Sequence, residues 1–211
     1  MSTSFAVFPT MDHIPSFREL LDVATDHLRA FLESYEITTS VRLAVTLHRL
    51  EPERPMVAFQ MSDPAWWGKD SFAWFHVPGV EGGTDAYARH MDSQGRGYIE
   101  DIKAKNMNEF ADRTASALRI GRYWTFDRSG GQPGIINIAY GMLAGSLAQL
   151  TNGFVFSEDG AWDYERLPAL PDFFLSTYFR PELNRDWINY NWTKKCISWL
   201  PDELRNVRIE K

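Results

Sequence analysis

The sequence predicts an α+β protein in which helices pack on one antiparallel sheet, with residues 1–211 forming a single domain. Two patterns support this. Apolar and polar residues alternate as in strands across residues 41–77, and apolar residues recur at helical spacing before residue 36 and again over residues 135–150. No repeat or long Pro/Gly-rich linker separates these regions. The change from strand-like to helical pattern near residues 80–84 marks the one place where a weak subdivision is expected.

Composition narrows the function classes. The chain is 44% apolar and 24% charged, which is typical of a soluble globular protein. A net charge of −6 argues against nucleic-acid binding, because nucleic-acid-binding proteins usually carry a basic face. The N-terminus has no secretory signal pattern, and the longest apolar stretch, residues 135–150, is short for a membrane span. We therefore expect a cytoplasmic protein without a nucleic-acid or membrane partner.

A helix is expected to begin at Ser16 after an irregular N-terminal segment. The run Ser16-Phe17-Arg18-Glu19 has the form of a capping box, in which the serine and glutamate side chains each bond the other's backbone N–H. Apolar residues then recur at helical spacing to about Glu36, which predicts an amphipathic helix. These residues are Phe17, Leu20, Leu21, Ala24, Leu28, Phe31 and Tyr35.

Three strands are expected next. Apolar and polar residues alternate over residues 41–47 and 57–61, which predicts an antiparallel hairpin closed by a turn at residues 51–55. Residues 71–77 carry the same alternation and predict a third strand. His48 and His76 fall in these strands and could be neighbours in the sheet.

From residue 84 the apolar spacing favours helix. A helix is expected from Thr84 until Gly95-Arg96-Gly97 interrupts it, and a second helix over residues 106–117. Tyr123, Trp124 and Phe126 predict a short aromatic strand, which is closed by a turn at Asp127-Arg128-Ser129-Gly130-Gly131.

The apolar residues of 135–150 lie almost all the way round the helical wheel, which predicts a fully buried helix. Gly141 and Gly145 indicate close approach of another element to it. A stop at Thr151-Asn152-Gly153, a strand over 154–156 and an aromatic helix over 172–179 should follow. The tail is rich in Trp and Tyr from residue 186 and ends in a charged segment that we expect to fray.

No motif in the sequence dictates a reaction. The five histidines lack metal-ligand spacing, and the single Cys196 excludes an internal disulfide and is expected to be a packed thiol. Ser146 lies inside a helix and lacks the context of a nucleophile elbow. The run Gly130-Gly131-Gln132-Pro133-Gly134 precedes a helix and could hold an anion, but a structural turn is the commoner explanation. We expect no cofactor, no metal and no catalytic residue.

Residues 158–172 carry the most unusual local composition. This segment contains five acidic residues and one basic residue, Arg166, with aromatic residues between them. One interpretation is a solvated acidic loop over a partly buried Trp162. The other is a docking surface, where carboxylates attract a basic partner and an aromatic side chain anchors it. The candidate partner-binding residues are Glu158, Asp159, Trp162, Asp163, Tyr164 and Glu165.

The run Thr151-Asn152-Gly153-Phe154-Val155-Phe156-Ser157-Glu158-Asp159-Gly160-Ala161-Trp162-Asp163-Tyr164-Glu165, with Pro168 and Tyr178-Phe179-Arg180-Pro181-Glu182 after it, resembles a family of bacterial polymorphic-toxin immunity proteins, immunity protein 52. The likeness covers about the C-terminal third. Proteins of this family are encoded beside toxins delivered by the type VI secretion system, typically restriction-endonuclease-like DNases. The family is not enzymatic, so the resemblance implies no catalytic residues and gives no toxin-contact positions.

The resemblance implies an immunity protein that binds and neutralises a cognate antibacterial toxin with a basic nuclease domain. An acidic protein fits such a partner, because carboxylates can mimic the phosphates that a nuclease attracts. An alternative of another class is a small cytosolic enzyme that uses dispersed carboxylates and His48 or His76 in a cleft. A deep pocket lined by these groups would favour the enzyme, whereas a broad acidic-aromatic surface would favour binding.

Overall fold

The computed structural model describes the chain except for residues 1, 52–55, 106–107, 206 and 208–211. The strands are β1 Thr3–Phe8, β2 Ala44–Arg49, β3 Met56–Val57, β4 Ser71–His76, β5 Thr84–His90, β6 Arg122–Arg128 and β7 Phe154–Phe156. The α-helices are α1 Phe17–Glu33, α2 Ser93–Ala104, α3 Ala111–Ile120, α4 Gly134–Leu150, α5 Pro171–Thr177 and α6 Trp187–Glu203, and short 3-10 helices are η1 Asn108–Phe110, η2 Tyr164–Arg166 and η3 Pro181–Leu183.

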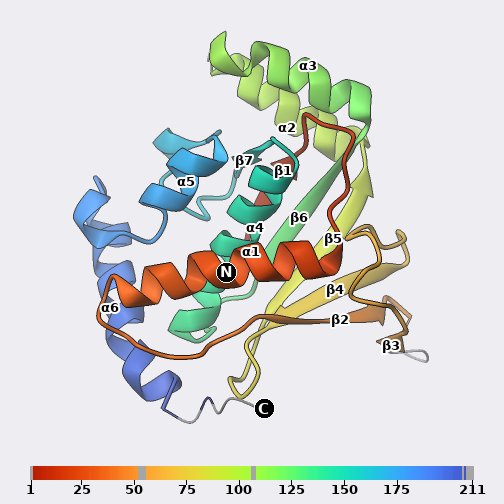
Figure 1. The fold of residues 1–211 in the computed structure, drawn as a ribbon. Helices are drawn as coiled ribbons and strands as arrows, with labels where there is room; N and C mark the ends of the chain where they lie inside the picture. Colours follow the sequence, from red (N-terminus) through yellow and green to blue (C-terminus); the bar gives the residue numbers. More distant parts are fainter. Residues whose placement is uncertain (1, 52–55, 106–107, 206, 208–211) are drawn as a thin grey trace.

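All seven strands within the described residues join one antiparallel sheet in the order β3-β2-β4-β5-β6-β1-β7 (Figure 1). The predicted fold class, α+β with helices packed on an antiparallel sheet, is confirmed. Residues 80–83 lie between β4 and β5, and Thr84 begins β5. These two strands are hydrogen-bonded neighbours, so the sheet is continuous across the place where a subdivision was expected. No helix within the described ranges is long and apolar enough to cross a membrane.

The first face of the sheet carries the main core and is covered by α1 and α4. The predicted capping box is present: the Ser16 hydroxyl accepts from the backbone N–H of Glu19, and the Glu19 carboxylate accepts from the backbone N–H of Ser16. The helix that follows buries Phe17, Leu20, Leu21, Ala24, Leu28, Phe31 and Leu32 against this face.

The helix α4 is buried on all sides from residue 134 to residue 148, as its apolar pattern predicts. Its glycines are required by close packing. A Cβ on Gly141 would lie 2.1 Å from the ring of Tyr178, and one on Gly145 would lie 2.6 Å from Leu175. The prediction of close approach at these two positions is confirmed.

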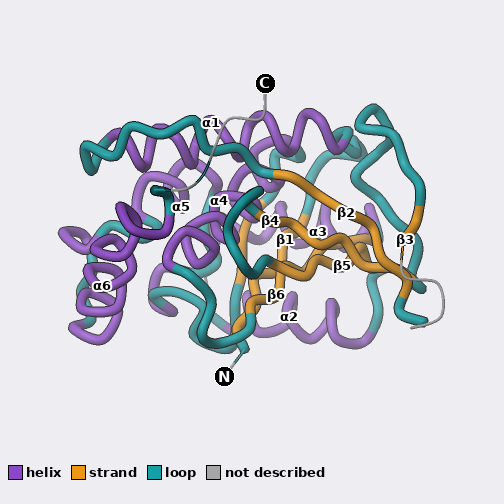
Figure 2. The backbone as a smooth tube through the Cα atoms, turned by 90° about the horizontal axis from the view of Figure 1, so that it is seen from below, coloured by secondary structure: helices purple, strands orange, loops and turns teal. Residues whose placement is uncertain are grey.

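The second face of the sheet is only partly covered. Over β1, β6 and β7 it packs against α2, η1 and α3, which form a second core around Phe8, Tyr98 and Tyr123. Figure 2 shows α1 and α2 on opposite sides of the strands. The side chains on the rest of this face are half-buried, and we call it the open face. Its residues are His48, Phe72, Trp74, His76, Asp85, Tyr87, Arg89 and Asp127.

Three sequence predictions were wrong. Residues 3–8, expected to be irregular, form β1 between β6 and β7. Residues 84–90, expected to be helical, form β5, in which Thr84, Ala86 and Ala88 point into the core. Gly95 and Gly97 lie inside α2 and do not interrupt a helix.

Other expectations need only small changes. The second hairpin strand is reduced to β3, residues 56–57, and the turn predicted at 51–55 falls largely outside the described residues. The helix expected at 106–117 begins as η1 and continues as α3 to residue 120. The aromatic tail is the helix α6, and the charged end expected to fray falls mostly outside the described residues.

Candidate functional site

The acidic segment of residues 158–165 is fixed to the sheet through Asp159. Oxygen Oδ2 of Asp159 accepts from the backbone N–H of Ser4 at 2.8 Å and from its hydroxyl at 3.0 Å. Oxygen Oδ1 accepts from the hydroxyl of Ser157 at 2.9 Å. This carboxylate therefore fastens the segment to β1, although the residue itself is exposed.

Trp162 lies in the core rather than on the surface. It is 4% exposed, stacks on Phe179 with ring centroids 5.6 Å apart, and meets Tyr178 edge-on at 5.0 Å. Its Nε1 has no hydrogen-bond partner among the described residues. As placed, Trp162 cannot serve as the exposed aromatic anchor of a docking surface.

The remaining candidates divide between core and surface. Asp163 is 7% exposed, and its Oδ2 lies 2.8 Å from Nε of Arg166 as an ion pair without an aligned hydrogen bond. Glu158 and Glu165 are exposed. Tyr164 lies in η2, but its side chain is outside the described part. Two of the six predicted residues thus remain as exposed carboxylates without a structural bond among the described groups.

The segment separates two regions of the surface that are hollowed. Asp159 lines a cavity of about 310 Å³ at the edge of the open face, which we call the sheet cavity. Further along, Gly160, Asp163 and Glu165 line a groove of about 600 Å³ beside the start of α6, which we call the α6 groove. The segment is therefore common to both hollows.

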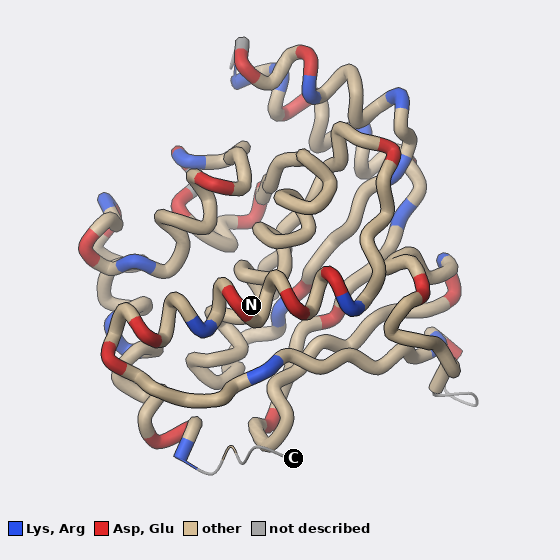
Figure 3. Tube along the Cα trace, viewed as in Figure 1, with Lys and Arg blue, Asp and Glu red and all other residues tan. Residues whose placement is uncertain are grey.

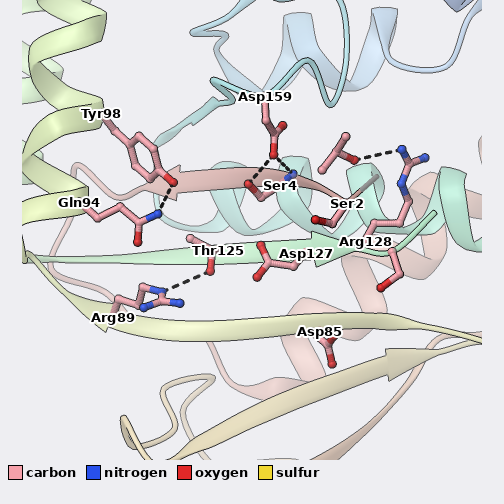
Figure 4. A pocket seen from close by; sticks show the side chains of 12 residues that line it. Ser2, Ser4, Asp85, Arg89, Gln94, Tyr98, Thr125, Asp127, Arg128 and Asp159 are labelled. Carbon is pink, nitrogen blue, oxygen red and sulfur yellow. Dashed lines mark hydrogen bonds between the residues drawn. The ribbon is translucent and has the colours of Figure 1, made fainter.

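Two carboxylates on neighbouring strands, Asp85 and Asp127, line the sheet cavity (Figure 4). Asp85 on β5 and Asp127 on β6 are direct cross-strand partners. Among the described residues neither carboxylate forms a hydrogen bond or an ion pair. Like charges directly opposite in a sheet repel each other, so this pair is unfavourable for the isolated fold.

The cavity raises the pKa of both carboxyls. Burial raises the pKa of Asp127 to about 6, with Arg89 lowering it and the carboxylates of Asp85 and Asp159 raising it further. Burial also raises the pKa of Asp85. Burial, then Asp101 and Asp159, raise the pKa of the nearby Glu158. The region therefore has more carboxylates than its own cations neutralise.

The walls of the sheet cavity are hydroxyl, amide and guanidinium groups. The amide of Gln94 donates to the hydroxyl of Tyr98 at 2.7 Å, and Nε of Arg89 donates to the hydroxyl of Thr125 at 3.5 Å. The guanidinium of Arg128 donates to the hydroxyl of Thr3 at 3.0 Å. Such a cavity can accept a cationic group on the carboxylates and hydrogen-bond it with the hydroxyls.

His48 and His76 lie on the open face, on neighbouring strands, but neither lines the sheet cavity. The ring of His48 is bonded to the hydroxyl of Thr46 at 2.7 Å and stacks on Phe72. Burial lowers the pKa of His76. The sheet cavity therefore has the carboxylates that the enzyme alternative needs, but neither of the two histidines lines it.

The other groups that the sequence offered for chemistry, the start of α4 and the thiol of Cys196, have structural roles. The first N–H groups of α4, at Gly134 and Ile135, donate to the carboxylate of Glu203 at 2.7 and 2.9 Å. An internal carboxylate therefore holds the position where an external anion could bind. Cys196 is buried, and burial raises its pKa to about 12, which confirms the expected packed thiol. Within the described residues no three His, Cys, Asp or Glu side chains are grouped to hold a metal.

Sequence reasoning missed Asp85 and Asp127 because it placed them in the wrong elements. Asp85 was assigned to a helix, and Asp127 was assigned to the turn after the aromatic strand. The available signal was the alternation Thr84, Ala86, Ala88 against Asp85, Tyr87, Arg89, which has the period of a strand.

No protein-family model, curated protein or solved structure matches the chain.

Proposed function

We propose that this chain is an immunity protein that binds and neutralises a cognate antibacterial toxin, with a nuclease effector of a type VI secretion system as the toxin class. The resemblance of residues 151–182 to immunity protein 52 supports the toxin class. The structure contributes an accessible cavity lined by Asp85, Asp127 and Asp159, in which neither Asp85 nor Asp127 forms an ion pair among the described residues. The proposal includes a cytoplasmic location and no catalytic role.

The single observation that carries the proposal is the cross-strand pair Asp85 and Asp127. Two carboxylates opposed across a sheet, half-buried and without a bonded cation among the described residues, destabilise the free protein. A cation from a partner would remove that repulsion on binding. The pair is therefore better suited to a bound state than to the isolated chain.

Charge on the rest of the surface supports this choice of site. Acidic and basic residues are interspersed along most of the trace (Figure 3), so the net charge of −6 does not produce a uniform acidic field. The sheet cavity gathers three carboxylates, Asp85, Asp127 and Asp159, against the two guanidinium groups of Arg89 and Arg128. A nuclease domain carries basic residues for its DNA phosphates, and a local cluster of carboxylates can engage the same residues.

Binding is tested by mixing the purified chain with the protein encoded by the adjacent open reading frame. We expect a one-to-one complex on size exclusion and survival of cells that express both proteins. A mixture that elutes as two separate proteins, with no rescue from killing, would contradict the proposed function.

The contribution of the cavity is tested by the double variant Asp85→Asn with Asp127→Asn. Removing two carboxylates that contact a basic partner should weaken binding by about tenfold or more, since a charged hydrogen bond contributes roughly 1.5–3 kcal/mol. The matched control is Asp22→Asn with Asp26→Asn on the exposed side of α1, which covers the opposite sheet face. Equal affinity of the cavity variant and the control would remove the cavity from the interface.

The enzyme alternative retains one favourable observation. A carboxyl with a pKa near 6 in a cavity of about 310 Å³ is suited to general acid–base chemistry. If this chain destroyed the toxin or its product, protection would occur with far less than one equivalent, and Asp127→Asn would abolish it. Protection that saturates at one equivalent favours binding instead.

A further inference from the structure

Exposed apolar side chains are concentrated in one part of the surface. Of the eight large apolar side chains that are exposed within the described residues, five lie between residues 173 and 190. Trp187 is 71% exposed and Ile188 59%, although both belong to the first turn of α6. Contiguous exposed apolar surface commonly marks an interaction site. The five are Phe173, Leu183, Trp187, Ile188 and Tyr190.

Two adjoining hollows lie among these side chains. Ile188 lines the α6 groove, and Phe173 lines a second groove of about 480 Å³ beside α5, which we call the α5 groove. Glu165 and Arg185 line both, so the two grooves share one wall. Two of the five exposed apolar side chains, Phe173 and Ile188, therefore line two adjoining grooves.

The rim of these grooves is mainly acidic. Glu109 lines the α5 groove, Asp186 lines the α6 groove, and Glu165 lines both. The cation Arg166 is already paired with Asp163 at 2.8 Å. Arg185 is the other cation that lines these grooves among the described residues. A partner with basic residues around an apolar centre would complement this surface in both charge and polarity.

We propose that the two grooves and the exposed start of α6 form a docking surface for a protein partner that inserts apolar side chains between basic ones. This inference rests on the proposed function and makes the toxin that partner. It supplies the aromatic anchor that the buried Trp162 cannot provide, because Trp187 is exposed and stands in the chain between Asp186 and Ile188, which both line the α6 groove. Exposed Trp residues are frequent centres of binding energy.

The acidic rim favours a different protein over a second copy of this chain. A two-fold contact places the same surface patch on both subunits, so Glu165 and Asp186 would meet the equivalent carboxylates of the other copy. Such opposition is repulsive, whereas a basic partner is attracted.

The test uses the double variant Trp187→Ser with Ile188→Ser. Both residues are exposed, and serine is tolerated in the first turn of a helix, so the fold should be retained. Affinity for the protein encoded by the adjacent reading frame should fall by at least about thirtyfold, as expected for the loss of a central anchor. The matched control is Leu50→Ser with Met56→Ser, which removes two exposed apolar side chains near the β3 edge of the sheet.

The outcomes separate this inference from the proposed function. If the unchanged chain binds and the Trp187/Ile188 variant binds equally well, the docking surface is wrong while the immunity function stands. If the unchanged chain does not bind at all, the proposed function fails and the docking surface fails with it. If the unchanged chain self-associates in sedimentation and the variant does not, the occupant is a second copy, which contradicts the partner assigned here.

Discussion

At the scale of single residues, Asp127 shows how the open face affects stability. Burial raises its pKa from the ordinary 3.8 to about 6, so the folded state favours the protonated carboxyl. The contribution of this group to stability is complete below pH 3.8 and is lost as the pH rises through 6. Ionised Asp127 at neutral pH therefore destabilises the folded state.

Asp127→Asn should accordingly stabilise the protein at pH 7.5. A shift of roughly two pKa units corresponds to about 1–3 kcal/mol, and the gain should disappear near pH 4. Urea unfolding of both proteins at pH 4, 6 and 7.5 measures it, with Asp22→Asn on α1 as the matched control. A variant that is less stable than the parent at pH 7.5 would show that the carboxylate is bonded within the fold.

Trp162, in contrast to Asp127, stabilises the folded state. Its ring packs between Tyr178 and Phe179 in the main core. Trp162→Ala should lower the free energy of unfolding by about 3–5 kcal/mol, while Glu165→Ala on the adjacent surface should change it by less than about 0.5 kcal/mol. Chemical denaturation gives both values. A small loss of stability in Trp162→Ala would contradict the burial of this side chain in the core.

At the scale of elements, α4 is held by close packing and by a cap from another helix. Gly141→Ala would place a Cβ 2.1 Å from the Tyr178 ring, and such overpacking typically costs about 1–3 kcal/mol. In α2, Gly97→Ala meets nothing within 4 Å and should stabilise by about 0.5–1 kcal/mol through helix propensity. Opposite signs of the two changes in melting temperature are expected, and two stabilising substitutions would contradict the packing described for α4.

The cap on α4 is Glu203 of α6. Because its two oxygens accept the N–H groups of Gly134 and Ile135, Glu203→Ala should destabilise the fold by about 1–2 kcal/mol. The neighbouring Asp202 and its partner Arg205 are both exposed, so Asp202→Ala should have an effect below about 0.5 kcal/mol. Thermal unfolding of the two variants compares them directly, and equal effects would exclude Glu203 as the cap.

The elements that the sequence predicted are those with a strong local signal. The capping box at Ser16, the all-round apolar helix α4 and the aromatic strand β6 each follow from residue type and spacing. Strand β5 was missed because its inward positions are the small Thr84, Ala86 and Ala88, whose weak apolar contrast hid a period of two. Strand β1 was missed because it is buried on both faces and shows no alternation.

Helix α2 was misjudged for a reason that only the tertiary structure supplies. Glycines normally weaken a helix, so Gly95 and Gly97 indicated an interruption. A Cβ at Gly95 would lie 2.6 Å from the Tyr123 ring, so packing requires a glycine there. The candidate site was limited in the same way, since its cross-strand carboxylates come from two strands 42 residues apart whose pairing no local pattern revealed.

At the scale of the whole molecule, the acidic segment has a structural role and a positional one. Asp159 fastens it to β1 through hydrogen bonds to Ser4, and the buried Trp162 and Asp163 hold it in the core. Glu158 is exposed next to Asp159, which lines the sheet cavity, and Glu165 lines the grooves by α5 and α6. Charge reversal intended to probe binding therefore belongs at Glu158 and Glu165, because a lysine at Asp163 would be placed in the core.

The most direct test of the immunity function is the dissociation constant of the complex with the adjacent gene's product, measured over a series of salt concentrations. We expect a tight one-to-one complex whose affinity falls as salt rises, because carboxylates on the open face attract a basic partner. The salt dependence should become weaker in the Asp85→Asn/Asp127→Asn variant. Absence of a complex, or a dissociation constant that does not change with salt, would contradict the account.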